Sequence, residues 1–261
     1  MSERLGGRLD PASWGGPTVG VLGGLGPAAT AVFLDVLVRA TAADTDQDHL
    51  DLLVSQHSST PDRTASILDP AAPDPGPVLA RDAAMLARTG VEILVLPCNT
   101  AHHFVHEVEQ AAARTGITFV NIVERTVATV SASLADRSRP VAVLATAGTV
   151  HARVYQDALE RAGLEALIPG PALQADLNTL IYEQVKANRP VDRALYASCL
   201  ARVAQLGAGA AVLGCTELSV IHDRFRADPV EVEGLAVVDS LTELATATIR
   251  AAGKQVAADF R

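Results

Sequence analysis

Apolar runs and helical patterns alternate in a regular order along the chain. Short runs of β-branched and aliphatic residues predict strands at residues 18–22, 50–55, 91–97, 118–123, 140–145, 164–168, 210–214 and 235–238. Between them, helical periodicity predicts helices at 27–40, 78–89, 101–115, 124–136, 149–162, 174–187, 192–206 and 240–252. This alternation predicts an α/β fold with mostly parallel sheets flanked by helices. Runs such as EILVLP and AAVLG are apolar throughout, as in strands that are buried on both faces.

The order of these elements occurs twice. TVGVLGGLGP begins a strand at Val19 and PVAVLATAGT begins a similar one at Val141, a shift of 141 − 19 = 122 residues. Cys98 and Cys215 each follow an apolar run and differ by 215 − 98 = 117 residues. A period this long indicates duplicated domains. We therefore expect two pseudo-symmetric domains with an active site in the cleft between them.

The repeat also suggests where the domains lie. We expect a first domain at 17–118 and 225–261 and a second at 119–224, with the segment from about 225 returning to close the first sheet. Residues 1–16 lack the apolar core of a signal peptide and predict a flexible extension.

The two cysteines in matched positions are the strongest candidates for chemistry. Cys98 in LPCNTAH is followed by Thr100, and Cys215 in LGCTEL by Thr216, each before a helical stretch. A threonine that caps a helix would place each thiol at a helix N-terminus, where the helix dipole favours the thiolate. Two such thiols on opposite sides of a cleft can remove a proton from one face of a carbon and return it to the other. Cys199 lies within a helical pattern and predicts a buried apolar side chain.

Other polar residues gather at the same strand-to-helix junctions. Arg63 in TPDRT follows the second strand and offers a guanidinium fork for a substrate carboxylate. Asn99, Thr146 and Thr149 lie at further junctions. The GGLGP stretch (23–27) is an incomplete phosphate-binding pattern, so we favour a turn that lines a small-anion site over a dinucleotide site.

Metal-dependent and serine-hydrolase chemistry have weaker support. His102 follows Cys98 by four residues, but no Cys-x-x-Cys and no clear His/carboxylate set completes a zinc site. No Gly-x-Ser-x-Gly elbow is present. We expect no metal.

Composition narrows the function classes. The net charge of −9 without a dense basic stretch argues against nucleic acid and anionic membranes as partners. No apolar run reaches the 18 residues of a membrane span. Three cysteines in a chain of this length argue against a disulfide framework and predict a cytoplasmic protein. The chain has only two lysines against 21 − 2 = 19 arginines, which draws attention to Lys186.

The motifs VGVLGGLGP, TPDRT, LPCNTAH, LATAGTVHARVYQ, YEQVKAN and LGCTEL together resemble the aspartate/glutamate racemase superfamily, specifically its aspartate racemase branch. The similarity spans roughly residues 18–245 in the family's order, and PCNTAH with GCTE is its most specific part. The resemblance implies two pseudo-symmetric α/β domains, no pyridoxal phosphate or other cofactor, no metal, and catalytic Cys98 and Cys215. It also implies substrate-binding roles for Arg63, Asn99, Thr100, Lys186 and Thr216. We add Thr146, Thr149 and Glu217 as further candidate substrate-binding residues.

We therefore expect an amino-acid racemase (an isomerase) that acts on aspartate or a similar small acidic substrate, and a homodimer. Leu25 replaces the methionine that is commoner in the family, and Gln56 and His57 replace asparagines, which bears on the preferred side chain more than on the chemistry. Two alternatives stay open. One is a related cysteine-dependent isomerase or decarboxylase of a dicarboxylate, and the other is a non-catalytic protein that binds an acidic metabolite.

Overall fold

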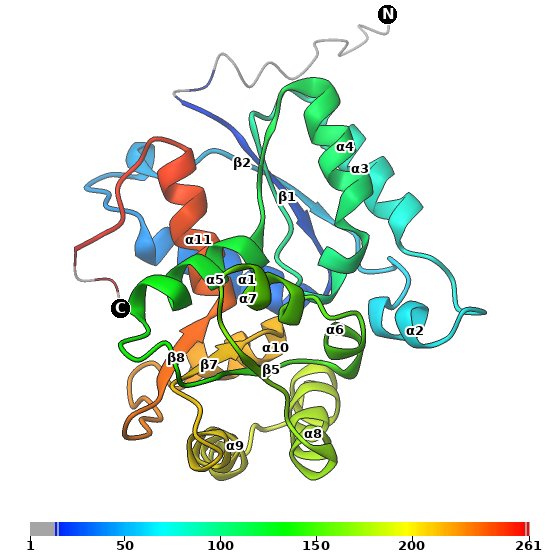
Figure 1. Ribbon diagram of the computed structural model, residues 1–261. Helices are drawn as coiled ribbons and strands as arrows, with labels where there is room; N and C mark the ends of the chain where they lie inside the picture. The colour runs from blue at the N-terminus through cyan, green and yellow to red at the C-terminus, as the bar shows by residue number, and fades with distance from the viewer. Residues whose placement is uncertain (1–13, 15, 259, 261) are drawn as a thin grey trace, which may run out of the picture.

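The computed structural model describes residue 14, residues 16–258 and residue 260, so most of the predicted extension 1–16 lies outside the described residues. Two four-stranded parallel sheets form the framework (Figure 1). The first has the order β2 (Leu52–Gln56), β1 (Val19–Gly23), β3 (Ile93–Val95), β4 (Thr118–Val120). The second has the order β6 (Ala166–Leu167), β5 (Val141–Leu144), β7 (Ala210–Leu213), β8 (Ala236–Asp239). Every strand pair in both sheets is parallel, which confirms the predicted α/β class.

The two sheets repeat one topology. β5, β6, β7 and β8 occupy the places in the second sheet that β1, β2, β3 and β4 occupy in the first. The strand bearing Cys98 therefore corresponds to the strand bearing Cys215, as the sequence repeat predicted.

The end of the chain differs from the expectation. The segment from about 225 was expected to close the first sheet, but its strand β8 pairs with β7 at the edge of the second sheet. This part of the prediction is wrong, because the apolar run at 235–238 is compatible with either sheet edge. The following helix α11 (Ser240–Ala251) packs on α1 (Pro27–Ala40) and α5 (Ile122–Ser133), and an isolated bridge joins Thr41 to Val256. The chain thus returns to the first half by a helix and a bridge, and the division into domains stays a prediction.

One hydrophobic core joins both halves. Val19 and Val21 of β1 and Val141 and Val143 of β5 point into a single core cluster with α1, α5, α7 (Gln156–Arg161) and α11, which lie between the sheets (Figure 1). Alternate residues along the same strands face outward. Separate helices cover these outward faces. The first sheet is covered by α3 (Gly76–Arg88) and α4 (Val105–Thr115). The second sheet is covered by α8 (Pro171–Asn178), the π-helix η4 (Thr179–Lys186), α9 (Arg193–Gln205) and α10 (Thr216–Arg224).

Short helices complete the fold, namely η2 (Asp46–Asp48), α2 (Arg63–Leu68), η3 (Thr100–Phe104) and α6 (Ala147–His151). Cys199 lies in α9 and is fully buried in the apolar core, as predicted. In the described part of the chain, no helix has the length and apolar character needed to cross a membrane.

Candidate active site

The carboxyl ends of β3 and β7 open onto one small cavity that contains both candidate cysteines. The side chains pack closely around it and leave a cavity volume of about 10 Å³, room for roughly one water molecule, so the site is nearly closed. Nine of the predicted site residues line it: Arg63, Cys98, Asn99, Thr100, Thr146, Lys186, Cys215, Thr216 and Glu217. Leu25, Asp62 and Thr64 complete the lining.

The two thiols reach this cavity by similar local structure. Cys98 follows β3 and precedes η3, while Cys215 follows β7 and is the N-cap residue of α10. The threonines do not cap these helices as expected, because the cap positions are taken by Asn99 and Cys215, and neither makes a side-chain capping bond. Both thiols are almost completely buried.

The charge state of Cys215 also differs from the expectation. Its thiol donates a hydrogen bond of 2.9 Å to Oε2 of Glu217. Burial, followed by the negative charge of Glu217, raises the pKa of the Cys215 thiol well above its ordinary value, although Lys186 acts in the opposite direction. The expected favouring of the thiolate by the helix dipole is therefore wrong for Cys215, because the desolvation penalty and the neighbouring carboxylate outweigh it.

Arg63 is a buried cation at the cavity wall. It begins the short helix α2, where the sequence suggested only a turn, and its side chain is 9% exposed. Nη1 donates to the carbonyl oxygens of Thr60 (3.3 Å) and Pro61 (3.0 Å), while Nε has no partner. Among the residues that the structure describes, no carboxylate lies within 4.0 Å of this guanidinium. A buried guanidinium without an anion is energetically unfavourable, so the cavity is suited to a ligand that supplies one.

Lys186 brings a second cation to the same cavity. It ends the π-helix η4, and its Nζ lies 3.9 Å from Oδ2 of Asp62 and 4.5 Å from the ring centre of Tyr182. Burial alone would lower the pKa of the ammonium, but the neighbouring negative charges, Glu217 first, reverse this and raise it. Lys186 therefore stays protonated at neutral pH.

Threonine hydroxyls connect the two halves beneath the cavity. Thr100 of the first half lies 3.1 Å from Thr146 and 2.8 Å from Thr149 of the second half, measured between hydroxyl oxygens. Thr64 donates to Thr146 at 3.3 Å, and Thr146 caps α6 by accepting from the amide of Thr149. Thr149 itself is fully buried and supports Thr146 from behind the lining.

The side chain of Asn99 is already engaged by the protein. Its amide donates to Ser240 at 2.9 Å, and its oxygen accepts from the hydroxyl of Tyr155 at 2.5 Å. Ser240 in turn donates to the carbonyl of Leu213, at the end of the strand that leads to Cys215. Asn99 thus links the two cysteine-bearing strand ends.

Some residues of the site escaped the sequence analysis. Asp62 and Thr64 flank Arg63 within the TPDRT motif, so the motif itself was the signal for them. Tyr155 and Tyr182 lie within the LATAGTVHARVYQ and YEQVKAN motifs, so for them too the motifs were the signal. Of the positions that depart from the family pattern, Leu25 lines the cavity, whereas His57 forms a 2.5 Å contact with Asp82.

His102 packs below Cys98 as a structural residue. Its Nδ1 lies 2.9 Å from the carbonyl oxygen of Cys98, which can only accept, so this nitrogen carries the proton. Burial lowers the pKa of His102 to about 4. No cluster of three or more His, Cys, Asp or Glu side chains suited to a metal ion is found within the described residues.

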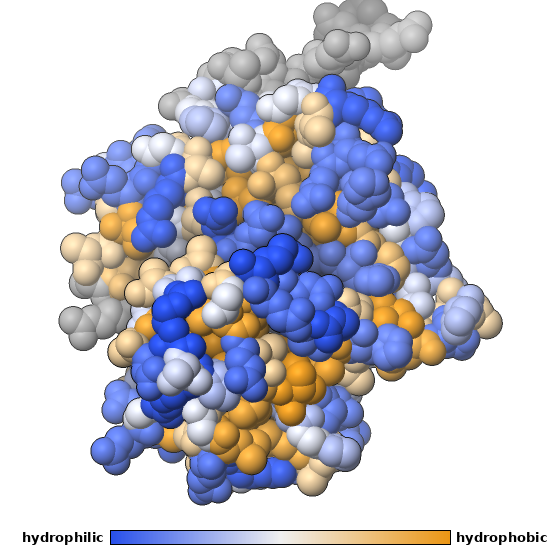
Figure 2. All heavy atoms as spheres, in the orientation of Figure 1, coloured by the Kyte–Doolittle hydropathy of each residue, from blue (hydrophilic) through white to orange (hydrophobic). Residues whose placement is uncertain are grey.

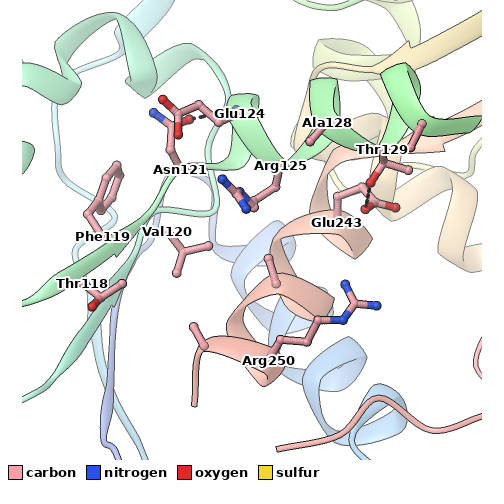
Figure 3. A pocket seen from close by; sticks show the side chains of 13 residues that line it. Thr118, Phe119, Val120, Asn121, Glu124, Arg125, Ala128, Thr129, Glu243 and Arg250 are labelled. Atoms are coloured by element: carbon pink, nitrogen blue, oxygen red, sulfur yellow. Dashed lines mark hydrogen bonds between the residues drawn. The ribbon is translucent and has the colours of Figure 1, made fainter. Parts of the chain in front are cut away.

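A larger hollow lies elsewhere, between β4, α5 and α11 (Figure 3). Its volume is about 600 Å³, and its polar lining includes Arg125, Arg250 and Glu243. Thr129 donates to Glu243 at 2.5 Å. None of the predicted site residues lies there, so its size does not make it the candidate active site.

Comparison with known proteins agrees with this geometry. The sequence profile described as Asp/Glu/Hydantoin racemase matches residues 22–248. The chain belongs to this racemase family. The Asp/Glu/hydantoin racemases are isomerases, so both the family and the enzyme class predicted from the motifs are confirmed.

Individual relatives of this racemase chain cover most of its length. The aspartate racemase of Picrophilus torridus is 26% identical, with a TM-score of 0.77 over 94% of this chain and 98% of that one. The broad specificity amino-acid racemase RacX of Bacillus subtilis is 26% identical over 236 residues, which are 88% of this chain and 96% of RacX. A glutamate racemase of Deinococcus radiodurans is 32% identical over 165 residues, 62% of this chain and 53% of the relative.

Proposed function

We propose that this protein racemises an acidic amino acid, aspartate foremost, without a cofactor, by two-base proton transfer at Cα between Cys98 and Cys215. The observation that carries the proposal is the buried Arg63 guanidinium, which has no anionic partner among the described residues and lines the same small cavity as both thiols. Lys186 is a second cation on the cavity wall. Two cations beside two thiols fit a substrate that carries a side-chain carboxylate next to an acidic Cα–H bond.

The α-hydrogen of an amino acid is much less acidic than a thiol, so the site must stabilise the carbanion. In our proposal the backbone N–H groups at the starts of η3 and α10 and the hydroxyls of Thr100 and Thr216 bind the α-carboxylate, where the negative charge develops. Arg63 and Lys186 hold the side-chain carboxylate and fix the orientation of the Cα–H bond between the thiols.

Aspartate is favoured by the similarity to an aspartate racemase over nearly the whole chain. The similarity to RacX, named for its broad specificity, makes a panel of substrates necessary. The test is incubation with individual L-amino acids in heavy water without added cofactor. Deuterium at Cα of aspartate together with formation of D-aspartate supports the proposal, whereas binding of aspartate without exchange at Cα favours a non-catalytic binding protein.

We also propose a cytoplasmic homodimer. All three cysteines are free and buried, which fits a reducing compartment. Apolar side chains lie at the surface over the part of the molecule where α8 and α9 lie (Figure 2), and Leu206 at the end of α9 is 59% exposed. Such a surface suits contact with a second copy. Light scattering during size-exclusion chromatography tests the dimer, and a mass near 27.1 kDa refutes it.

A further inference from the structure

The two cysteine-bearing strand ends differ in the residues that follow each thiol. The second residue after Cys98 is Thr100, whose hydroxyl bonds to Thr149, whereas the second residue after Cys215 is Glu217. Glu217 is 6% exposed, and its Oε2 accepts the Cys215 thiol hydrogen bond at 2.9 Å. The fold is pseudo-symmetric around the cavity, but within the described part of the chain only the Cys215 thiol is hydrogen-bonded to a carboxylate.

We propose that Glu217 is the residue that holds Cys215 as the protonated thiol, so that the resting enzyme begins turnover with Cys215 as proton donor and Cys98 as proton acceptor. This inference rests on the proposed racemase function and reassigns Glu217, which was expected to bind substrate. A carboxylate 2.9 Å from the sulfur stabilises the S–H form by hydrogen bonding and repels a thiolate. The depth of burial keeps water from screening that repulsion.

The proton balance follows directly. Cys98 takes the Cα proton from one face of the substrate, so that the Cα–H bond breaks and an S–H bond forms. Cys215 gives its proton to the opposite face, so that its S–H bond breaks and the new Cα–H bond forms. The Cys215 thiolate is then left beside the Glu217 carboxylate, and this repulsion favours return of a proton to Cys215. The resting state is restored when Cys98 passes its proton to Cys215, or when Cys98 releases its proton to solvent and Cys215 takes one up from solvent.

Other charged and titratable groups lie around Cys215 and must be considered with Glu217. Lys186 on η4 is the cation that favours the thiolate, and it opposes Glu217 only in part. The remaining groups that line the cavity or lie beside it are Asp62 and Arg63 from the start of α2, Tyr155 beside Gly214, and Tyr182 from η4.

Racemisation has an equilibrium constant of one, so turnover rates alone do not reveal the resting protonation state. The direct measurement is the pH profile of alkylation by iodoacetamide, read separately for each cysteine by peptide mass spectrometry. The position of each midpoint reports ionisation, whereas the absolute rate also depends on access. In the wild type we expect the midpoint of Cys215 to lie above that of Cys98.

In Glu217→Gln, which keeps the shape and removes the charge, we expect the Cys215 midpoint to fall so that alkylation at pH 8 rises about ten-fold, the effect of one pKa unit. Glu217→Asp, which keeps the charge, should stay closer to the wild type. Glu243→Gln makes the same change at a half-buried carboxylate that bonds to a hydroxyl, and should leave both midpoints unchanged.

An unchanged Cys215 midpoint in Glu217→Gln overturns the inference. So does a wild-type midpoint for Cys215 below that of Cys98, and this second outcome needs no variant that must fold. Deuterium exchange at Cα, measured on the same samples, separates the two proposals. A shifted Cys215 midpoint without exchange on any amino acid refutes the racemase function and leaves the thiol–carboxylate pair in place.

Discussion

Replacing Arg63 by Met should separate substrate recognition from stability. The substitution keeps most of the aliphatic length of the side chain and removes the guanidinium from the cavity wall. In the proposed complex, that guanidinium donates charge-assisted hydrogen bonds to the side-chain carboxylate of aspartate. Loss of such a bond costs about 1.5–3 kcal/mol, which corresponds to a roughly ten- to hundred-fold fall in kcat/KM for aspartate. A neutral amino acid such as alanine never makes this contact, so its kcat/KM should change little.

The free protein should tolerate the same change. Arg63→Met removes the Nη1 hydrogen bonds to Thr60 and Pro61, worth about 0.5–1.5 kcal/mol each. It also removes a buried charge that has no carboxylate within 4.0 Å among the described residues, which offsets part of that loss. We therefore expect Tm to change by only a few degrees, since 1 kcal/mol corresponds to about 2–4 °C in a chain of this size. The rise in Tm on adding aspartate should shrink, because weaker binding gives less stabilisation.

The assay is initial-rate racemisation of L-aspartate and L-alanine, with thermal melts of each variant with and without aspartate. Arg63→Lys keeps the charge but loses the planar fork, and should fall between the wild type and Arg63→Met. Arg250→Met is the matched control, because this arginine is exposed and lines the other hollow. An unchanged ratio of kcat/KM for aspartate to kcat/KM for alanine would refute the reasoning. If kcat/KM falls equally for both substrates, Arg63 binds the α-carboxylate or is structural.

Other predictions follow from the thiols and the buried imidazole. Cys98→Ser and Cys215→Ser should each lower racemisation by several powers of ten, because serine is too weak an acid to serve as base, whereas Cys199→Ser should stay near wild type in a rate assay. Lys186→Gln should lower kcat/KM for aspartate about ten- to hundred-fold and affect alanine less, and equal effects would remove Lys186 from side-chain recognition. Burial lowers the pKa of His102 from 6.5 to about 4, so the unfolded chain takes up a proton at a higher pH than the folded protein does. Stability is therefore lost as the pH falls from about 6.5 to 4, and acid melts of His102→Asn should show a shallower decline. Burial raises the pKa of Cys199 from 9.0 to about 11, so its contribution to stability is complete below pH 9 and is lost as the pH rises to 11; alkaline melts of Cys199→Ala should lack that part of the decline.

Local patterns along the chain predict most of the elements and their order. The apolar run at 210–214 and the helical pattern at 27–40 correspond to β7 (Ala210–Leu213) and α1 (Pro27–Ala40), because periodicity records which faces of each element are buried. The repeat also predicted that the strands bearing Cys98 and Cys215 are equivalent, since matched patterns fold into matched units. Nine of the ten predicted site residues line one cavity. All of these except Lys186, which ends η4, come from segments that follow the carboxyl ends of strands in the two sheets, where α/β folds place their binding sites.

Strand pairing, the hydrogen-bond partners of side chains and the burial of the thiols depend instead on contacts between segments that lie far apart in the sequence. The run at 235–238 predicted a strand, but which sheet it joins depends on distant contacts, and β8 pairs with β7. The side chain of Asn99 is engaged by Tyr155 and Ser240, which lie 56 and 141 residues away in the sequence. The environment of the Cys215 thiol also depends on tertiary packing. A helix N-terminus can be predicted from sequence, but the burial that raises the pKa of its thiol arises only when elements such as η4 and α10 pack together.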